Sequence, residues 1–154
     1  MVNILLKKLS ISLAALLLPF SKAYAWVAPI WLTNLSETVG GRDADQRREI
    51  TCVALAVYYE SRGESLRGQR AVASVVMNRK HSSRFGGSAC EVIHQRGQFS
   101  FVRGQALRPT GAPWQRSIEI ATEFVDRDRG EVPYLYFTNS SRLRGYRIGH
   151  HVFR

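Results

Sequence analysis

Hydrophobic residues form an almost continuous run over residues 50–59, in which only Thr51 is polar. A helix that is apolar on every side is surrounded by other parts of the protein, and this run is too short to cross a membrane. The pattern therefore predicts a buried central helix over Asp43–Tyr59, with Asp43 or Asp45 as its N-cap. The residues that follow Tyr59 lead into Gly63 and favour a helix stop.

Helical periodicity recurs in two later segments. A second helix is predicted over Leu66–Lys80, where Ser65 can act as the N-cap. A third is predicted over Trp114–Arg127, because its charges lie opposite its apolar residues and Pro113 suits a first turn. On the second helix, the residues that share one face are Leu66, Val72, Val75, Val76 and Arg79, whereas Gln69 and Arg70 lie off it.

The remaining predicted elements are short. After a loop at His81–Ser88, residues 89–94 can form one helical turn. Tyr134–Thr138 is aromatic-rich and carries the clearest strand signal, and Tyr146–Phe153 can return as its partner strand. We therefore expect a mainly helical α+β fold, built as a single domain with a small β-hairpin.

The first 25 residues are typical of a secretory signal peptide. Two lysines precede a short apolar stretch, and residues 23–25 match the small-x-small cleavage pattern. We expect residues 26–49 to form an N-terminal arm and the start of the central helix, and residues 50–154 to form the main folded domain. The expected location is the periplasm or the cell wall, with no stable membrane span after cleavage; an uncleaved anchor is the alternative.

The chain is basic, with a formal net charge of +10. Removal of the three lysines of the signal peptide would leave +7. A basic exported protein suits an anionic partner such as a wall polymer, lipid head groups or nucleic acid, although a basic surface that only aids solubility is the alternative. The long Lys/Arg runs of nucleic-acid binders are missing, so nucleic acid is not expected as a partner.

Cys52 and Cys90 are most simply one disulfide in an exported protein, which would contribute about 2–4 kcal/mol. Two buried free thiols are the alternative, because Cys52 lies in a very apolar segment. Two cysteines without C-x-x-C spacing and scattered histidines do not form a metal site, and no cofactor is expected. On a strand, His150 and His151 would face opposite sides, one packed and one exposed.

Glu60 lies where the buried helix ends. Apolar walls and the negative pole of the helix dipole both favour the neutral acid, so its pKa would be raised and it could act as a general acid near neutral pH. The alternative is an exposed glutamate that only marks where a core helix surfaces.

Glu64 is the nearby second carboxylate that a hydrolase would need at about 5–9.5 Å from the first. Its alternative role is structural, as an acceptor of N–H groups at the start of the next helix, and the way helix starts collect acids favours this role. The segment Arg96–Gly104 could form a substrate-binding wall, or a hairpin whose Phe residues enter the core.

Five sequence blocks, in order, resemble one known family. AVYYESRGES, GQRAVASVVMNR, SACEVIHQRGQFSF, LYFTN and IGHHVFR are similar to the pattern of the bacterial cell wall hydrolase family that includes the spore cortex-lytic enzymes. The resemblance spans about residues 50–154 and implies a lysozyme-like fold, cleavage of the glycan strands of peptidoglycan, and an acid/base role for Glu60. It also implies a cleft lined by Gln98, Phe99, Ser100, Tyr136 and Asn139, and we expect Glu64 among the substrate-binding residues as well.

The reaction expected from this resemblance is cleavage of the β-1,4 bond between N-acetylmuramic acid and N-acetylglucosamine. Without a second carboxylate, the 2-acetamido group of the substrate can stabilise the oxocarbenium ion and the C6 hydroxyl can close on C1, as in a lytic transglycosylase. The alternatives are a muramidase that recruits Glu64, and a non-catalytic protein that binds peptidoglycan. Arg62, Arg79 and Arg103 are either contacts for peptide-stem carboxylates or solvated surface residues. Ser100 could instead cap a turn, and Tyr136 could fill the core.

Overall fold

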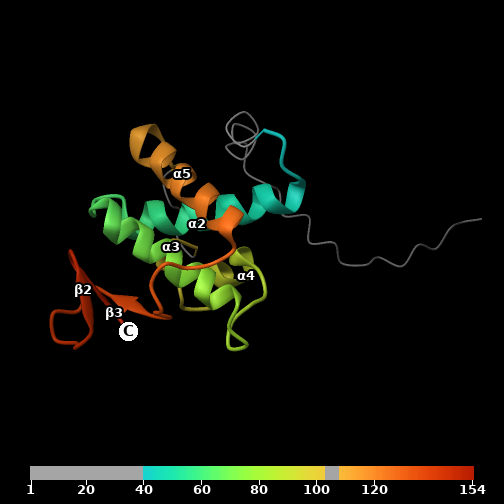
Figure 1. Cartoon of the computed structure of the whole chain (residues 1–154). Coiled ribbons are helices and arrows are strands. Elements are labelled where there is room, and N and C mark those ends of the chain that lie inside the picture. The colour runs from blue at the N-terminus through green and yellow to red at the C-terminus, as the bar shows by residue number, and fades with distance from the viewer. Residues whose placement is uncertain (1–39, 103–107) are drawn as a thin grey trace, which may run out of the picture.

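The computed structural model describes residues 40–102 and 108–154 (Figure 1). The predicted signal peptide and residues 26–39 of the predicted arm lie outside the described residues. The helices are α2 (Ala44–Ser61), α3 (Leu66–Lys80), α4 (Ala89–His94), the 3-10 helix η2 (Ser100–Val102) and α5 (Gly111–Arg127), and the strands are β1 (Phe137–Thr138), β2 (Tyr146–Ile148) and β3 (His151–Phe153). The expected class, mainly helical α+β, is confirmed.

Helix α2 is the buried central helix that the hydrophobic run predicts. Asp43 is its N-cap, and the side chain accepts a hydrogen bond of 2.8 Å from the backbone N–H of Gln46. The helix continues to Ser61, two residues beyond the predicted end, and the Ser61 hydroxyl donates to the carbonyl of Val57. Glu60 therefore lies inside the last turn of α2.

Helix α3 has the predicted bounds, and the Ser65 hydroxyl accepts from the N–H of Gly68 at 3.3 Å. Its predicted face is wrong at two positions, because Leu66 is 54% exposed and Gln69 is 3% exposed. The side-chain amide of Gln69 donates to the carbonyl of Glu64 at 2.9 Å, which satisfies this buried polar group. Residues of α3 enter two separate hydrophobic clusters, so more of its circumference is buried than a one-faced helix would show.

The larger core surrounds α2, which lies between α5 on one side and α3 with α4 on the other (Figure 1). The smaller cluster joins α3 to the sheet through Ala71, Val72, Val75, Ile148 and Phe153. None of the helices within residues 40–102 and 108–154 has the length and hydropathy that a membrane span requires.

The predicted two-stranded hairpin is a three-stranded antiparallel sheet with the order β1-β3-β2. The segment expected to form one strand, Tyr146–Phe153, turns back on itself at Gly149, whose φ is +56°, so that β2 and β3 pair with each other. This is a correction to the prediction. Strand β1 then pairs with β3, with Phe137 opposite Phe153.

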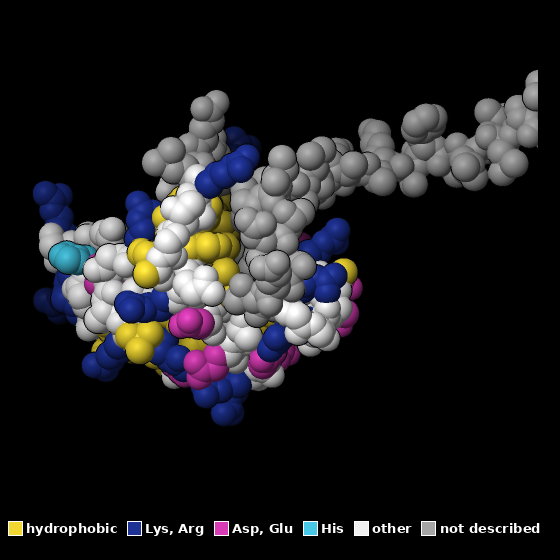
Figure 2. Space-filling model, turned by 90° about the horizontal axis from the view of Figure 1, so that it is seen from above, with side chains coloured by type: hydrophobic (Ala, Val, Ile, Leu, Met, Phe, Trp, Pro, Cys, Tyr) yellow, Lys and Arg dark blue, Asp and Glu magenta, His cyan; other side chains and the backbone are white. Residues whose placement is uncertain are grey.

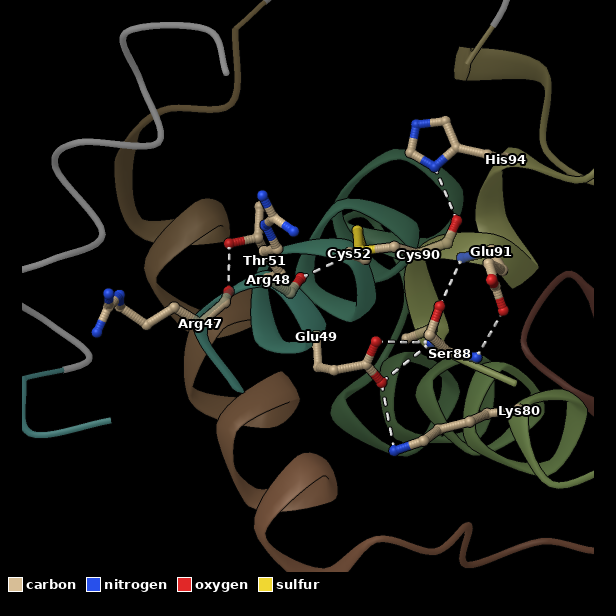
Figure 3. Close-up of a disulfide and its surroundings, with 11 residues drawn as sticks. Arg47, Arg48, Glu49, Thr51, Cys52, Lys80, Ser88, Cys90, Glu91 and His94 are labelled. Atoms are coloured by element: carbon tan, nitrogen blue, oxygen red, sulfur yellow. Dashed lines mark hydrogen bonds and ion pairs between the residues drawn. A yellow bond between two sulfur atoms is a disulfide. The ribbon is translucent and has the colours of Figure 1, made fainter. Parts of the chain in front are cut away.

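A disulfide joins α2 to α4 through Cys52 and Cys90, whose Cα atoms are 5.1 Å apart (Figure 3). The predicted bridge is present, and the alternative of two free thiols is wrong. Beside it, the carboxylate of Glu49 accepts the backbone N–H of Ala89 at 2.9 Å and pairs with Lys80 Nζ at 3.3 Å. One residue of α2 thus ties α4 and α3 to the central helix.

Candidate active site

Glu60 is half-buried in the last turn of α2. Burial raises the pKa of its carboxyl group, because the charged form loses hydration. The negative end of the helix dipole acts in the same direction. No hydrogen bond or ion pair of this carboxyl occurs within the part of the chain that the structure describes. The raised pKa of Glu60 is the direction that the end of the hydrophobic run predicts.

An aromatic stack flanks the end of α2. The rings of Tyr59 and Phe101 are stacked with centroids 4.8 Å apart, and Phe101 lies 5.8 Å from Phe99. These contacts bring the segment of residues 98–101 beside the residue that precedes Glu60. Sequence reasoning missed Tyr59 and Phe101, although the aromatic pair next to Glu60 and the second Phe of QFSF were the available signals.

The predicted residues of the QFSF segment have different surroundings. Gln98 and Ser100 are exposed, with Ser100 opening η2. Phe99 is 2% exposed and belongs to the core, so its ring supports this surface from within instead of contacting a ligand directly. The described residues of this segment form a turn and η2, and no hairpin.

Tyr136 and Asn139 come from the segment that contains β1. Tyr136 is 38% exposed and Asn139 is exposed. Phe137 lies 6.4 Å from Phe99, centroid to centroid, which places this segment beside QFSF. The structure thus brings Tyr136 near the QFSF segment, and exposure agrees with a binding role better than with core filling.

Arg79 lies between these two segments. It is 4% exposed, and its guanidinium carbon is 5.0 Å from the ring centroid of Phe85 and 5.5 Å from those of Phe99 and Tyr136. Its Nε donates to the carbonyl of Leu135 at 2.7 Å, whereas Nη1 is buried with no hydrogen-bond partner among the described residues. Burial lowers the pKa of Arg79. A solvated surface arginine is therefore the wrong description of this residue.

The other two candidate arginines differ from Arg79. Arg62 is exposed, with its guanidinium carbon 4.9 Å from the ring centroid of Tyr58. Arg103 lies outside the described residues.

Glu64 faces the β2–β3 turn. Its carboxylate accepts the backbone N–H of His150 at 3.3 Å and lies 2.7 Å from His150 Nδ1, with the Glu64 side chain 11% exposed. Burial raises the pKa of Glu64, but the hydrogen bonds and charge of His150 outweigh it, so the pKa is lowered overall. The N–H that Glu64 accepts belongs to a turn far along the chain and not to the next helix.

The two adjacent histidines differ as predicted, with one packed and one exposed. His151 is 2% exposed, and its ring lies 5.2 Å from that of Phe137, whereas the His150 side chain is 87% exposed. The reason is not strand alternation, because His150 belongs to the turn that precedes β3. Burial lowers the pKa of His151.

A surface hollow of about 510 Å³ lies at the start of α5 and contains none of the predicted site residues. Its lining residue Trp114 contacts Tyr58, with ring centroids 5.9 Å apart. Tyr58 and Glu60 are two positions apart on α2, which separates them by roughly 200° around the helix axis. We therefore assign the candidate site to the Glu60 face and not to this hollow.

Comparisons with known proteins agree with the resemblance. A family model described as Cell Wall Hydrolase matches residues 63–154, a range that includes Glu64 and begins three residues after Glu60. The spore cortex-lytic enzyme of Halalkalibacterium halodurans is 32% identical over 114 residues, and that of Bacillus subtilis is 32% identical over 117 residues. Each match covers 68% of this chain but only 34% and 37% of the relatives, so the chain spans about a third of their length. No solved structure matches the chain significantly. The chain belongs to the cell wall hydrolase family.

Proposed function

We propose that this protein cleaves the β-1,4 bond between N-acetylmuramic acid and N-acetylglucosamine in peptidoglycan, as a lytic transglycosylase with Glu60 as acid and base. The observation that carries the proposal is the half-buried Glu60 carboxyl with a raised pKa at the end of the central helix. The relatives are named spore cortex-lytic enzymes, which supports a wall polymer as the substrate.

In the first step, Glu60 donates its proton to the glycosidic oxygen and the bond from that oxygen to C1 of the muramic residue breaks. The acetamido oxygen of the substrate stabilises the positive charge that develops at C1. The Glu60 carboxylate then removes the proton of the C6 hydroxyl, and O6 bonds to C1. The product is a 1,6-anhydro end, Glu60 regains its proton, and no water is consumed.

Transglycosylation is favoured over hydrolysis by the state of Glu64. A second carboxylate that acts as base or nucleophile must be free to face the sugar, whereas Glu64 is held by two hydrogen-bonding groups of His150. Because His150 holds Glu64 in this way, we propose that Glu64 supports the site and does not itself act as base or nucleophile.

The exposed residues Gln98, Ser100, Tyr136 and Asn139 are the proposed contacts to the glycan, with Phe99 supporting them from the core. We further propose that the signal peptide directs the protein across the inner membrane, so that it meets its substrate in the periplasm or cell wall.

The test is digestion of purified sacculi by the wild type, Glu60→Gln and Glu64→Gln, with Glu119→Gln as an exposed carboxylate control. We expect anhydro-muramyl ends from the wild type, Glu64→Gln and the control, and a loss of about 100-fold or more for Glu60→Gln. Mass spectrometry separates these products from the reducing muramyl ends of a hydrolase.

If the wild type produced reducing muramyl ends and Glu64→Gln did not, the muramidase mechanism would replace the proposed transglycosylase mechanism. Binding of the wild type to sacculi without any soluble product would indicate a non-catalytic binder. Full activity of Glu60→Gln would show that Glu60 is not the catalytic acid and base.

A further inference from the structure

The C-terminal part of the sequence carries basic residues without acidic ones. After Glu131 the chain contains no Asp or Glu, yet it contains Arg142, Arg144 and Arg147 within six residues. Arg142 and Arg144 lie on the loop between β1 and β2, and Arg147 lies on β2, which is an edge strand of the sheet. We call these three residues the arginine patch.

The arginine patch has no counter-charge among the residues that the structure describes. All three side chains are exposed, and none forms an ion pair within residues 40–102 and 108–154. Some arginines elsewhere are paired, such as Arg42 with Asp126 at 2.6 Å and Arg70 with Glu123 at 2.6 Å, whereas other exposed arginines of the described residues form no ion pair. The acid that reaches this end of the sheet, Glu64, pairs with His150.

The loop that carries the patch comes close to β3 where it enters β2. A Cβ atom on Gly145 would lie 2.7 Å from the Val152 side chain and 2.6 Å from the carbonyl of Phe153, so the loop backbone approaches β3 closely. Val152 pairs with Arg147 and is fully buried. Figure 2 shows Lys and Arg side chains spread over this face, including its left edge, and Asp and Glu mostly at its lower middle and right, where Lys and Arg also lie.

We propose that the arginine patch binds the carboxylates of the peptide stems of peptidoglycan. The identity of the polymer rests on the proposed function, whereas the charge and exposure of the patch do not. Guanidinium groups bind carboxylates through two parallel hydrogen bonds. These arginines have no ion pair with another described residue that such binding would have to break. Leu143, which is 38% exposed, lies between two of the arginines and adds apolar contact.

The test measures binding to sacculi by the full chain carrying Glu60→Gln, which prevents cleavage. The variant replaces Arg142, Arg144 and Arg147 with Gln, and the matched control replaces the exposed Arg48, Arg84 and Arg129 with Gln. We expect the patch variant to bind about tenfold more weakly at low salt, as three exposed ion pairs would contribute. The control should change affinity less than threefold, and high salt should remove the difference.

A second arm uses glycan strands whose peptide stems have been removed by an amidase. The unsubstituted patch should then bind as weakly as the patch variant. Equal binding of the patch variant and its control, or undiminished binding to stem-free glycan, would overturn the proposal. Binding to anionic phosphatidylglycerol vesicles is measured in parallel. If the patch variant lost affinity only for these vesicles and not for sacculi, the proposal would also be overturned. Absence of cleavage with patch-dependent binding would refute the proposed function alone.

Discussion

Two glutamates four positions apart, Glu60 and Glu64, have opposite pKa shifts because their surroundings differ. Burial without a described hydrogen-bond partner raises the pKa of Glu60. Glu64 is also removed from water, but hydrogen bonds from His150 lower its pKa overall. At the level of single residues, the surroundings favour the neutral form of Glu60 and the charged form of Glu64.

The pKa of Glu60 predicts how stability depends on pH. A carboxyl whose pKa is raised by folding contributes stability that is present below the unfolded pKa and is lost as pH rises through the folded pKa. Gln at this position stays neutral, so Glu60→Gln should melt at a higher temperature than the wild type at pH 7, with the difference shrinking as the pH is lowered towards 4. Calorimetry at both pH values checks this. A lower melting temperature for Glu60→Gln at pH 7 would contradict the burial of this carboxyl.

At the scale of elements, the β2–β3 turn depends on a close approach between distant segments. Gly149 has φ +56°, and a Cβ atom there would lie 1.8 Å from Glu64 Oε2. The turn therefore requires glycine for two reasons, its backbone conformation and the space that the Glu64 carboxylate occupies.

Gly149→Ala should lower the free energy of unfolding by about 1–3 kcal/mol, because alanine strains the turn and displaces Glu64. Gly63→Ala is the matched control, since a Cβ atom there meets nothing within 4 Å. Its effect should stay within about 0.5 kcal/mol. Urea denaturation of both variants measures the difference, and equal effects would rule out the described turn geometry.

The disulfide is the second feature at this scale. It closes a loop of 38 residues between α2 and α4, which restricts the unfolded chain. Replacing Cys52 and Cys90 together with Ala should reduce the free energy of unfolding by about 2–4 kcal/mol. Denaturation of the wild type with and without reductant provides the independent comparison. No change on reduction would mean that the bridge does not stabilise the fold.

At the scale of the whole molecule, ion pairs connect helices that the sequence separates widely. Arg70 on α3 reaches Glu123 on α5 at 2.6 Å and also pairs with Glu131, which follows α5. Arg127 lies 2.6 Å from Glu123 as well. Glu123 and Glu131 are thus paired within the protein, whereas the arginine patch forms no ion pair with the described residues, in keeping with the external anion proposed for it.

Arg70→Gln should cost about 1–2 kcal/mol of stability, because it leaves Glu123 and Glu131 close together without this shared cation. The cost should fall in high salt, which screens these partly exposed charges. Arg116→Gln, at an exposed position, is the control. Thermal unfolding at two salt concentrations gives the measurement, and a salt-independent loss equal to that of the control would argue against the network.

Local chemistry made several elements predictable. Asp43 and Ser65 cap their helices through hydrogen bonds to residues three positions on, so both helix starts could be read from neighbouring letters. The division of the predicted strand at Gly149 could not, because the partner that occupies the space beside it, Glu64, lies far away in the sequence. For the same reason, neighbouring residues do not indicate that Gln69 and Arg79 are buried.

The sequence by itself determined the buried central helix, the position of Glu60 at its end, the cysteine pair and the family, because hydrophobic periodicity, capping residues and ordered motifs are properties of the linear chain. Only the tertiary structure decided that Glu64 faces His150, that Phe99 and Arg79 are buried between segments, and that Arg142, Arg144 and Arg147 remain unpaired. Burial and ion pairing depend on which distant segments meet, and that is set by packing of the whole chain.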